Sequence, residues 1–123
     1  MKILRDLLGF GKLTKEEREL LKELQGYGLS DRVCDYYKNN VKNNKNDSYA
    51  TIKKKIIRNI VLGKEAPKDT KNENKRMFYY GNLSVQINVL EKEIVWIKNY
   101  HNHSTWEVDK EKKQYIEKLL KIA

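Results

Sequence analysis

Residues 76–89 read RMFYYGNLSVQINV and contain the clearest strand pattern in the chain. In its second half, residues 83–89, apolar and polar side chains alternate, which is typical of a strand with one buried face. Gly81 and Asn82 precede that segment and form a dipeptide that favours a two-residue hairpin turn. The stretch therefore predicts two antiparallel strands, 76–80 and 83–89, joined by a tight turn.

The residues after this hairpin predict a third strand and a helix. A polar turn at 90–93 is followed by the apolar segment 94–100, which we expect to pair with the preceding strand. Apolar residues then recur at helical spacing across 115–120, in a helix that begins at Glu107 or Asp109. The C-terminal half is thus predicted to be a three-stranded antiparallel meander followed by a helix.

Three helices are predicted before the hairpin. Thr14 and Glu17 form a capping box, in which each side chain bonds to the backbone of the other residue. Ser30 and Ser48 are N-cap residues that indicate the starts of two further helices. The last of these covers about 49–62, where isoleucine and valine repeat at helical spacing on one face.

These elements fit one domain. A chain of 123 residues is long enough for a single modest hydrophobic core. We predict one α+β domain over 1–123, in which N-terminal helices pack on a three-stranded antiparallel meander and a C-terminal helix follows. The helical part covers about 1–63, a flexible connector covers 64–75, and the sheet with the last helix covers 76–123.

Composition indicates a cytoplasmic protein that does not act at a membrane. No apolar run reaches the roughly 18 residues that a membrane span needs, and the first residues lack a signal-peptide pattern. Cys34 is the one cysteine and has no internal disulfide partner, which favours a reducing compartment. We expect Cys34 to be a small buried residue on a helix.

The net charge of +9 points to a polyanionic partner. Its distribution is uneven, because residues 48–68 carry six basic residues against one acidic residue, Glu65. We therefore predict a nucleic-acid-contacting surface on the polar side of the helix over 49–62, although such a run also suits an ordinary solvated face. The residues expected to contact phosphates are Lys53, Lys54, Lys55 and Arg58.

All histidines and tryptophans lie in one short segment, residues 96–106, which reads WIKNYHNHSTW. Histidine titrates near neutral pH and suits the two proton transfers of metal-free RNA cleavage. The candidate catalytic residues are His101, His103, Lys98 and Arg76, and the candidate base-stacking residues are Tyr79, Tyr100 and Trp106.

Other interpretations of this segment remain open. The two histidines also suit a solvated loop, and Trp96 is expected in the core because it lies between Val95 and Ile97 in the third strand. A metal site needs three or four ligands, and only Glu107 and Asp109 are nearby carboxylates, so no metal and no cofactor is expected.

From about residue 48 onward, the order of elements resembles small basic toxins of the RelE/ParE-like fold and related metal-independent ribonucleases. The comparison rests on the helix around 52–61, the RMFYYGNLSVQINV hairpin and KNYHNH at the end of the third strand. The resemblance covers about 75 residues in topology. It implies RNA cleavage without a metal, on ribosome-bound message.

Three functions therefore follow from the sequence. The first is binding of nucleic acid, with RNA favoured over DNA, by a regulatory or accessory factor. The second is a metal-independent endoribonuclease of the RelE-like type. The third is a modulator from a mobile element that binds a protein partner or forms a homodimer.

Overall fold

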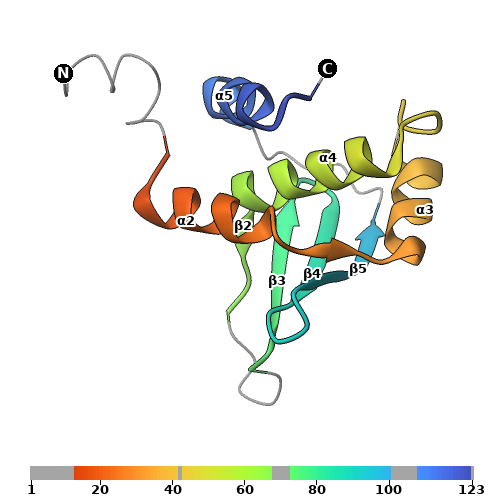
Figure 1. The fold of residues 1–123 in the computed structure, drawn as a ribbon, viewed down its shortest axis with the longest axis horizontal. Coiled ribbons are helices and arrows are strands. Elements are labelled where there is room, and N and C mark those ends of the chain that lie inside the picture. Colours follow the sequence, from red (N-terminus) through yellow and green to blue (C-terminus); the bar gives the residue numbers. More distant parts are fainter. Residues whose placement is uncertain (1–12, 42, 68–72, 101–107, 123) are drawn as a thin grey trace.

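The computed structural model describes residues 13–41, 43–67, 73–100 and 108–122. Within these residues, helices lie on one side of a sheet, so the expected α+β class is confirmed (Figure 1). The sheet is mixed and has five strands in the order β1-β5-β4-β3-β2, which is larger than the predicted three-stranded meander.

The predicted meander forms the centre of this sheet. Strands β3 (Lys75–Tyr80) and β4 (Leu83–Asn88) are antiparallel, and β5 (Glu93–Asn99) pairs with the other edge of β4. Gly81 in the hairpin turn has a φ of 58°, a left-handed conformation that costs glycine little. The hairpin turn at Gly81 and Asn82 is therefore confirmed.

Two short edge strands were not predicted. Strand β1 (Gly28–Leu29) runs parallel to β5, inside the segment assigned to helices alone. Strand β2 (Lys64–Glu65) runs antiparallel to β3, so the predicted connector over 64–75 is wrong at its start. A strand of two residues is too short to show an alternating pattern in the sequence. Its formation also depends on pairing with a strand that is distant in sequence.

A tyrosine hydroxyl occupies the outer edge of β1. Tyr49 Oη accepts a hydrogen bond from the Leu29 N–H at 3.0 Å and donates one to the Leu29 carbonyl at 2.6 Å. Both backbone groups that Leu29 would otherwise present at the edge are thus satisfied. An occupied edge cannot recruit a further strand at this position.

The helices begin at the residues that the sequence indicated. Thr14, Ser30 and Asp109 are N-caps whose side chains accept backbone N–H groups, and Thr14 completes its capping box with Glu17. Ser48 caps the longest helix in the same way. The helices are α2 (Lys15–Leu24), α3 (Asp31–Asn40), α4 (Tyr49–Leu62) and α5 (Lys110–Leu120).

Helix α4 is the centre of the packing. It contacts β3, α2, α3 and α5, and Figure 1 shows it between α5 and the strands. Its predicted apolar face is confirmed, since the isoleucine side chains at 52, 56, 57 and 60 are buried. Cys34 on α3 is also buried in this core, and burial raises the pKa of its thiol, as expected for an unreactive cysteine.

Trp96 does not lie in the core, contrary to the prediction. The pairing of β4 with β5 shifts between Gln86 and Ile87, so that Ile94 and Ile97, three residues apart, both face the helices. This bulge places Trp96 opposite Gln86, on the other face of the sheet and only partly buried.

Gly63, directly after α4, is predicted to be intolerant of a side chain. A Cβ at this position would lie 2.6 Å from the Tyr79 carbonyl oxygen and 3.0 Å from that of Asn59. Because backbone must move to admit it, we expect Gly63→Ala to lower the free energy of unfolding by about 1–3 kcal/mol, measured by urea denaturation.

Gly26→Ala is the matched control for this prediction. Its Cβ would lie 3.5 Å from the Glu23 carbonyl, an ordinary contact, so we expect stability equal to or slightly above that of the wild type. Equal stability of the two variants would show that β2 and β3 do not hold the backbone closely against Gly63.

Candidate nucleic-acid interface

One row of side chains crosses four strands on the face of the sheet turned away from the helices. The pairing register aligns Lys64 of β2, Tyr79 of β3, Ser84 of β4 and Lys98 of β5. Adjacent strands are about 4.8 Å apart, so the row brings cationic and aromatic groups together. The next row, which includes Phe78, Val85 and Ile97, faces the opposite way and is buried in the core.

We call this face the outer sheet face. Its residues follow from the register and from the alternation of side chains along each strand. They are Lys64, Lys75, Met77, Tyr79, Ser84, Gln86, Asn88, Glu93, Trp96 and Lys98. Glu93 is the one carboxylate among them, and it lies in the row of Lys75 and Asn88, away from the row of Lys98.

The aromatic side chains on this face are accessible. Tyr79 is 47% exposed, and Ser84 beside it is buried. Tyr100, directly after β5, is 49% exposed and donates its backbone N–H to the Asn82 carbonyl at 3.0 Å. Lys98 Nζ lies 5.5 Å from the centre of the Tyr100 ring, within range of a cation–π interaction.

Such a surface is suited to single-stranded nucleic acid. Exposed rings stack on unpaired bases, and lysines beside them neutralise phosphates. The side-chain amide of Gln86 lies on the same face and can donate and accept hydrogen bonds, whereas that of Asn88 is bonded to Glu91 and to the backbone of the following turn. The predicted stacking residues Tyr79 and Tyr100, together with Lys98, are therefore brought to one end of the outer sheet face.

Arg76 is not part of this group. It faces the helix side of β3, where its guanidinium donates two hydrogen bonds of 2.7 Å to the Glu65 carboxylate and lies 5.2 Å over the Phe78 ring. The Glu65 hydrogen bonds raise the pKa of Arg76, and its charge is neutralised locally. The structure thus separates Arg76 from Lys98, with which the sequence had grouped it.

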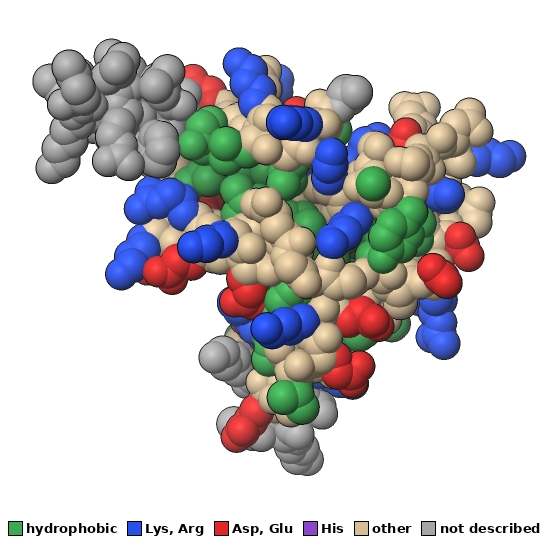
Figure 2. All heavy atoms as spheres, in the orientation of Figure 1, with side chains coloured by type: hydrophobic (Ala, Val, Ile, Leu, Met, Phe, Trp, Pro, Cys, Tyr) green, Lys and Arg blue, Asp and Glu red, His purple; other side chains and the backbone are tan. Residues whose placement is uncertain are grey.

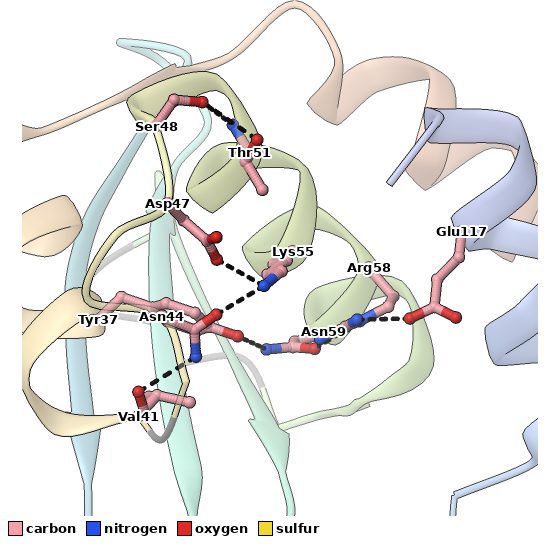
Figure 3. A network of polar contacts seen from close by, with 10 residues as sticks. All are labelled: Tyr37, Val41, Asn44, Asp47, Ser48, Thr51, Lys55, Arg58, Asn59 and Glu117. Atoms are coloured by element: carbon pink, nitrogen blue, oxygen red, sulfur yellow. Dashed lines mark hydrogen bonds and ion pairs between the residues drawn. The ribbon is translucent and has the colours of Figure 1, made fainter. Parts of the chain in front are cut away.

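The structure also does not leave all four basic residues predicted on α4 free to contact phosphate. Arg58 is 9% exposed and donates to Glu117 of α5 at 2.6 Å and to the Asn59 side chain at 3.1 Å (Figure 3). Lys55 donates to Asn44 at 2.8 Å and forms an ion pair with Asp47 (Figure 3). Neither cation is available to phosphate in this arrangement.

Arg58 and Lys55 have partners within the protein because α4 has no fully solvated side. Asn59 continues the network inward by donating to the Tyr37 hydroxyl at 3.3 Å (Figure 3). A buried arginine needs a carboxylate and hydrogen-bond partners, and Glu117 and Asn59 supply them. Lys53 and Lys54 remain partly exposed on α4, at a groove that is separate from the outer sheet face.

His101, His103 and Trp106 lie outside the described residues. His101 directly follows Tyr100 in the sequence. Among the residues that the structure describes, no three His, Cys, Asp or Glu side chains group closely enough to hold a metal ion. In that part of the chain no helix is both long enough and apolar enough to cross a bilayer.

Two residues of the outer sheet face were assigned elsewhere by the sequence analysis. Lys64 was assigned to a connector, because β2 has no pattern of its own. Trp96 was assigned to the core because its neighbours Val95 and Ile97 are apolar, and regular alternation counted from the buried Ile94 also places it there unless a bulge intervenes. The register from Tyr79 to Ser84 could have been read from the hairpin, since a two-residue turn fixes which residues lie opposite.

The Arg58–Glu117 pair is predicted to stabilise the packing of α5 on α4. Glu117→Ala leaves a largely buried guanidinium without its carboxylate, so we expect a loss of about 1.5–3 kcal/mol in the free energy of unfolding. Lys118→Ala, an exposed change on the same helix, is the control and should change stability by less than about 0.5 kcal/mol. A Glu117→Ala variant as stable as Lys118→Ala would contradict this role of the pair.

Comparison with known proteins identifies the family. The model of the YorE family matches residues 27–121, a range that contains all of the described strands together with α3, α4 and α5. The chain is 32% identical over 99 residues to the SPbeta prophage-derived uncharacterized protein YorE of Bacillus subtilis (strain 168), covering 73% of this chain and 76% of that protein. No solved structure matches the chain significantly. The chain therefore belongs to the YorE family.

Proposed function

We propose that this protein binds single-stranded nucleic acid, RNA in preference to DNA, on the outer sheet face. The observation that carries the proposal is the row from Tyr79 through Ser84 to Lys98, continued by the contact of Lys98 with Tyr100. It places two exposed rings and a lysine on one open surface. This is the combination that binds unpaired bases and their phosphates.

The energetics of stacking support this surface over the basic helix. Stacking of a base on an aromatic side chain contributes about 1–3 kcal/mol and tolerates any base. A lysine that already has a carboxylate partner, such as Lys55, gains little from a phosphate because it must first lose that partner. Contacts with Tyr79 and Tyr100 require no such exchange.

The overall charge supports attraction of a polyanion. The chain carries +9, which draws nucleic acid toward the protein over distances of about a Debye length. Lys64, Lys75 and Lys98 add local positive charge on the outer sheet face. We propose a regulatory or accessory factor acting in the cytoplasm, and the prophage origin of the YorE relative supports a role in a mobile element.

A metal-independent endoribonuclease of the RelE-like type is the alternative function. It is favoured by the position of His101 and His103 directly after Tyr100 in the sequence, and disfavoured by the pairing of Arg76 with Glu65 on the opposite face. Incubation with labelled RNA in EDTA separates the two functions. RNA that stays intact supports binding without catalysis. Cleavage by the wild type that is absent in the His101→Ala and His103→Ala variants establishes the alternative.

The Tyr79 ring is predicted to contribute to RNA affinity. Tyr79→Ala removes a stacking surface, so we expect affinity for a labelled single-stranded RNA to fall by about 1–3 kcal/mol, measured by fluorescence anisotropy. Tyr79→Phe keeps the ring and should bind like the wild type. Equal affinity of the wild type and the alanine variant would remove Tyr79 from the interface.

The Lys98 charge is predicted to contribute to the salt dependence of RNA binding. Each phosphate contact with a single strand contributes about 0.7 to the slope of log affinity against log salt concentration. We expect Lys98→Ala to reduce the slope by about that amount. Lys110→Ala, an exposed lysine at the start of α5, is the matched control, and an equal loss in both variants would indicate a general charge effect.

A further inference from the structure

A groove of about 390 Å³ lies between the first half of α4 and the C-terminal end of α5. Its apolar lining includes Tyr49 and Ile57 of α4 and Leu119 of α5. Leu119 is 50% exposed and Tyr49 is 43% exposed. Large apolar side chains that remain exposed next to one another in a hollow are typical of a contact surface for another molecule.

Lysines surround this apolar lining. Lys53 and Lys54 of α4 and Lys121 after α5 line the groove, and none of the described residues lining it is acidic. Figure 2 shows this side of the molecule, with hydrophobic side chains exposed between α5 and the helices beneath it and with Lys and Arg side chains around them. The groove is therefore apolar at its base and cationic at its rim.

The start of α4 adds to the positive potential. The first turns of α2, α3 and α5 contain acidic residues, whereas that of α4 contains none. The partial positive charge of the α4 N-terminus is thus not compensated within its own first turn, and Asp47, directly before the N-cap, is paired with Lys55. At the other end of the groove, the Lys121 N–H caps α5 by donating to the Glu117 and Lys118 carbonyls.

We propose that this groove binds an acidic amphipathic helix of a protein partner. Leucine or isoleucine side chains of the partner would contact Leu119, Ile57 and Tyr49, and its glutamates or aspartates would pair with Lys53, Lys54 and Lys121. A helix that lies in a groove presents anchors at i, i+3, i+4 and i+7, which matches a hollow between two helices.

Charge and surface chemistry decide against other occupants. A second copy of this chain also carries +9 and is repelled, and the basic N-terminal residues MKILRDLLGFGK are equally unsuited to a lysine rim. Nucleic acid would satisfy the lysines but would leave the half-exposed Leu119 without an apolar partner. The groove lies on the helix side of the sheet, so the partner would leave the outer sheet face uncovered and this inference does not depend on RNA binding.

Fluorescence anisotropy with designed peptides tests the proposal. The probe is a peptide of about 14 residues, four helical turns, with leucine at i, i+3, i+4 and i+7 and glutamate at the exposed positions. A second peptide has lysine in place of every glutamate. The protein is compared with a Lys53→Glu/Lys54→Glu variant and with Lys15→Glu/Lys110→Glu, which makes the same charge change on exposed residues at the starts of α2 and α5 that do not line the groove.

We expect saturable binding of the acidic peptide and none of the lysine peptide. The Lys53→Glu/Lys54→Glu variant should bind the acidic peptide at least about 10-fold more weakly and should gain affinity for the lysine peptide. Leu119→Ser, a change at a half-exposed position, should also weaken binding while circular dichroism remains unchanged. The Lys15→Glu/Lys110→Glu control should bind like the wild type.

Four outcomes would overturn the proposal. The first two are the absence of saturable binding and an equal loss of binding in both double variants. The third is a concentration-dependent dimer in sedimentation that Leu119→Ser abolishes, which would assign the groove to a second copy. The fourth is loss of RNA affinity in the Lys53→Glu/Lys54→Glu variant alone, which would assign it to nucleic acid.

Discussion

The burial of α4 between α5 and the sheet is the constraint on which the rest of the structure depends. Its isoleucines face the sheet and the neighbouring helices, and this forces Arg58 into a site where less than a tenth of the residue is exposed. Such a charge requires a carboxylate, which Glu117 supplies from α5 at 2.6 Å. The same helix begins with Tyr49, whose hydroxyl bonds to both backbone groups of Leu29 and fixes the edge strand. One helix therefore positions α5 and one edge of the sheet.

This arrangement determines which surfaces can act on other molecules. The helices occupy one side of the sheet, so the core faces of β3, β4 and β5 are buried and their opposite faces point outward. Tyr79 and Lys98 are exposed for this reason, and Arg76 is not available with them because it lies on the inner side with Glu65. The pairing of Arg58 and Lys55 within the protein leaves Lys53 and Lys54 as the partly exposed basic residues of α4.

The sequence predicts the parts of this molecule whose signals are local. Capping residues at Thr14 and Ser48 and the turn at Gly81 act over a few residues, and the structure confirms each of them. Features that depend on distant partners were missed: β1 and β2 form only by pairing with strands elsewhere, and the carboxylate partner of Arg58 is a glutamate 59 positions away. The candidate site likewise combines residues with a local signal and residues without one. Tyr79 follows from hairpin alternation, whereas the outward position of Trp96 requires a bulge that the sequence does not mark.

We propose two binding surfaces on opposite sides of one small domain, of which the outer sheet face binds single-stranded RNA. The most direct measurement is a titration of the protein with single-stranded RNA, followed by amide proton–nitrogen NMR spectra. If RNA binds the outer sheet face, shift changes concentrate at Tyr79, Ser84 and Lys98 in the central strands and the amides of α5 remain unchanged. Changes concentrated along α4 and α5, or no changes on the strands at saturating RNA, would contradict binding on that face.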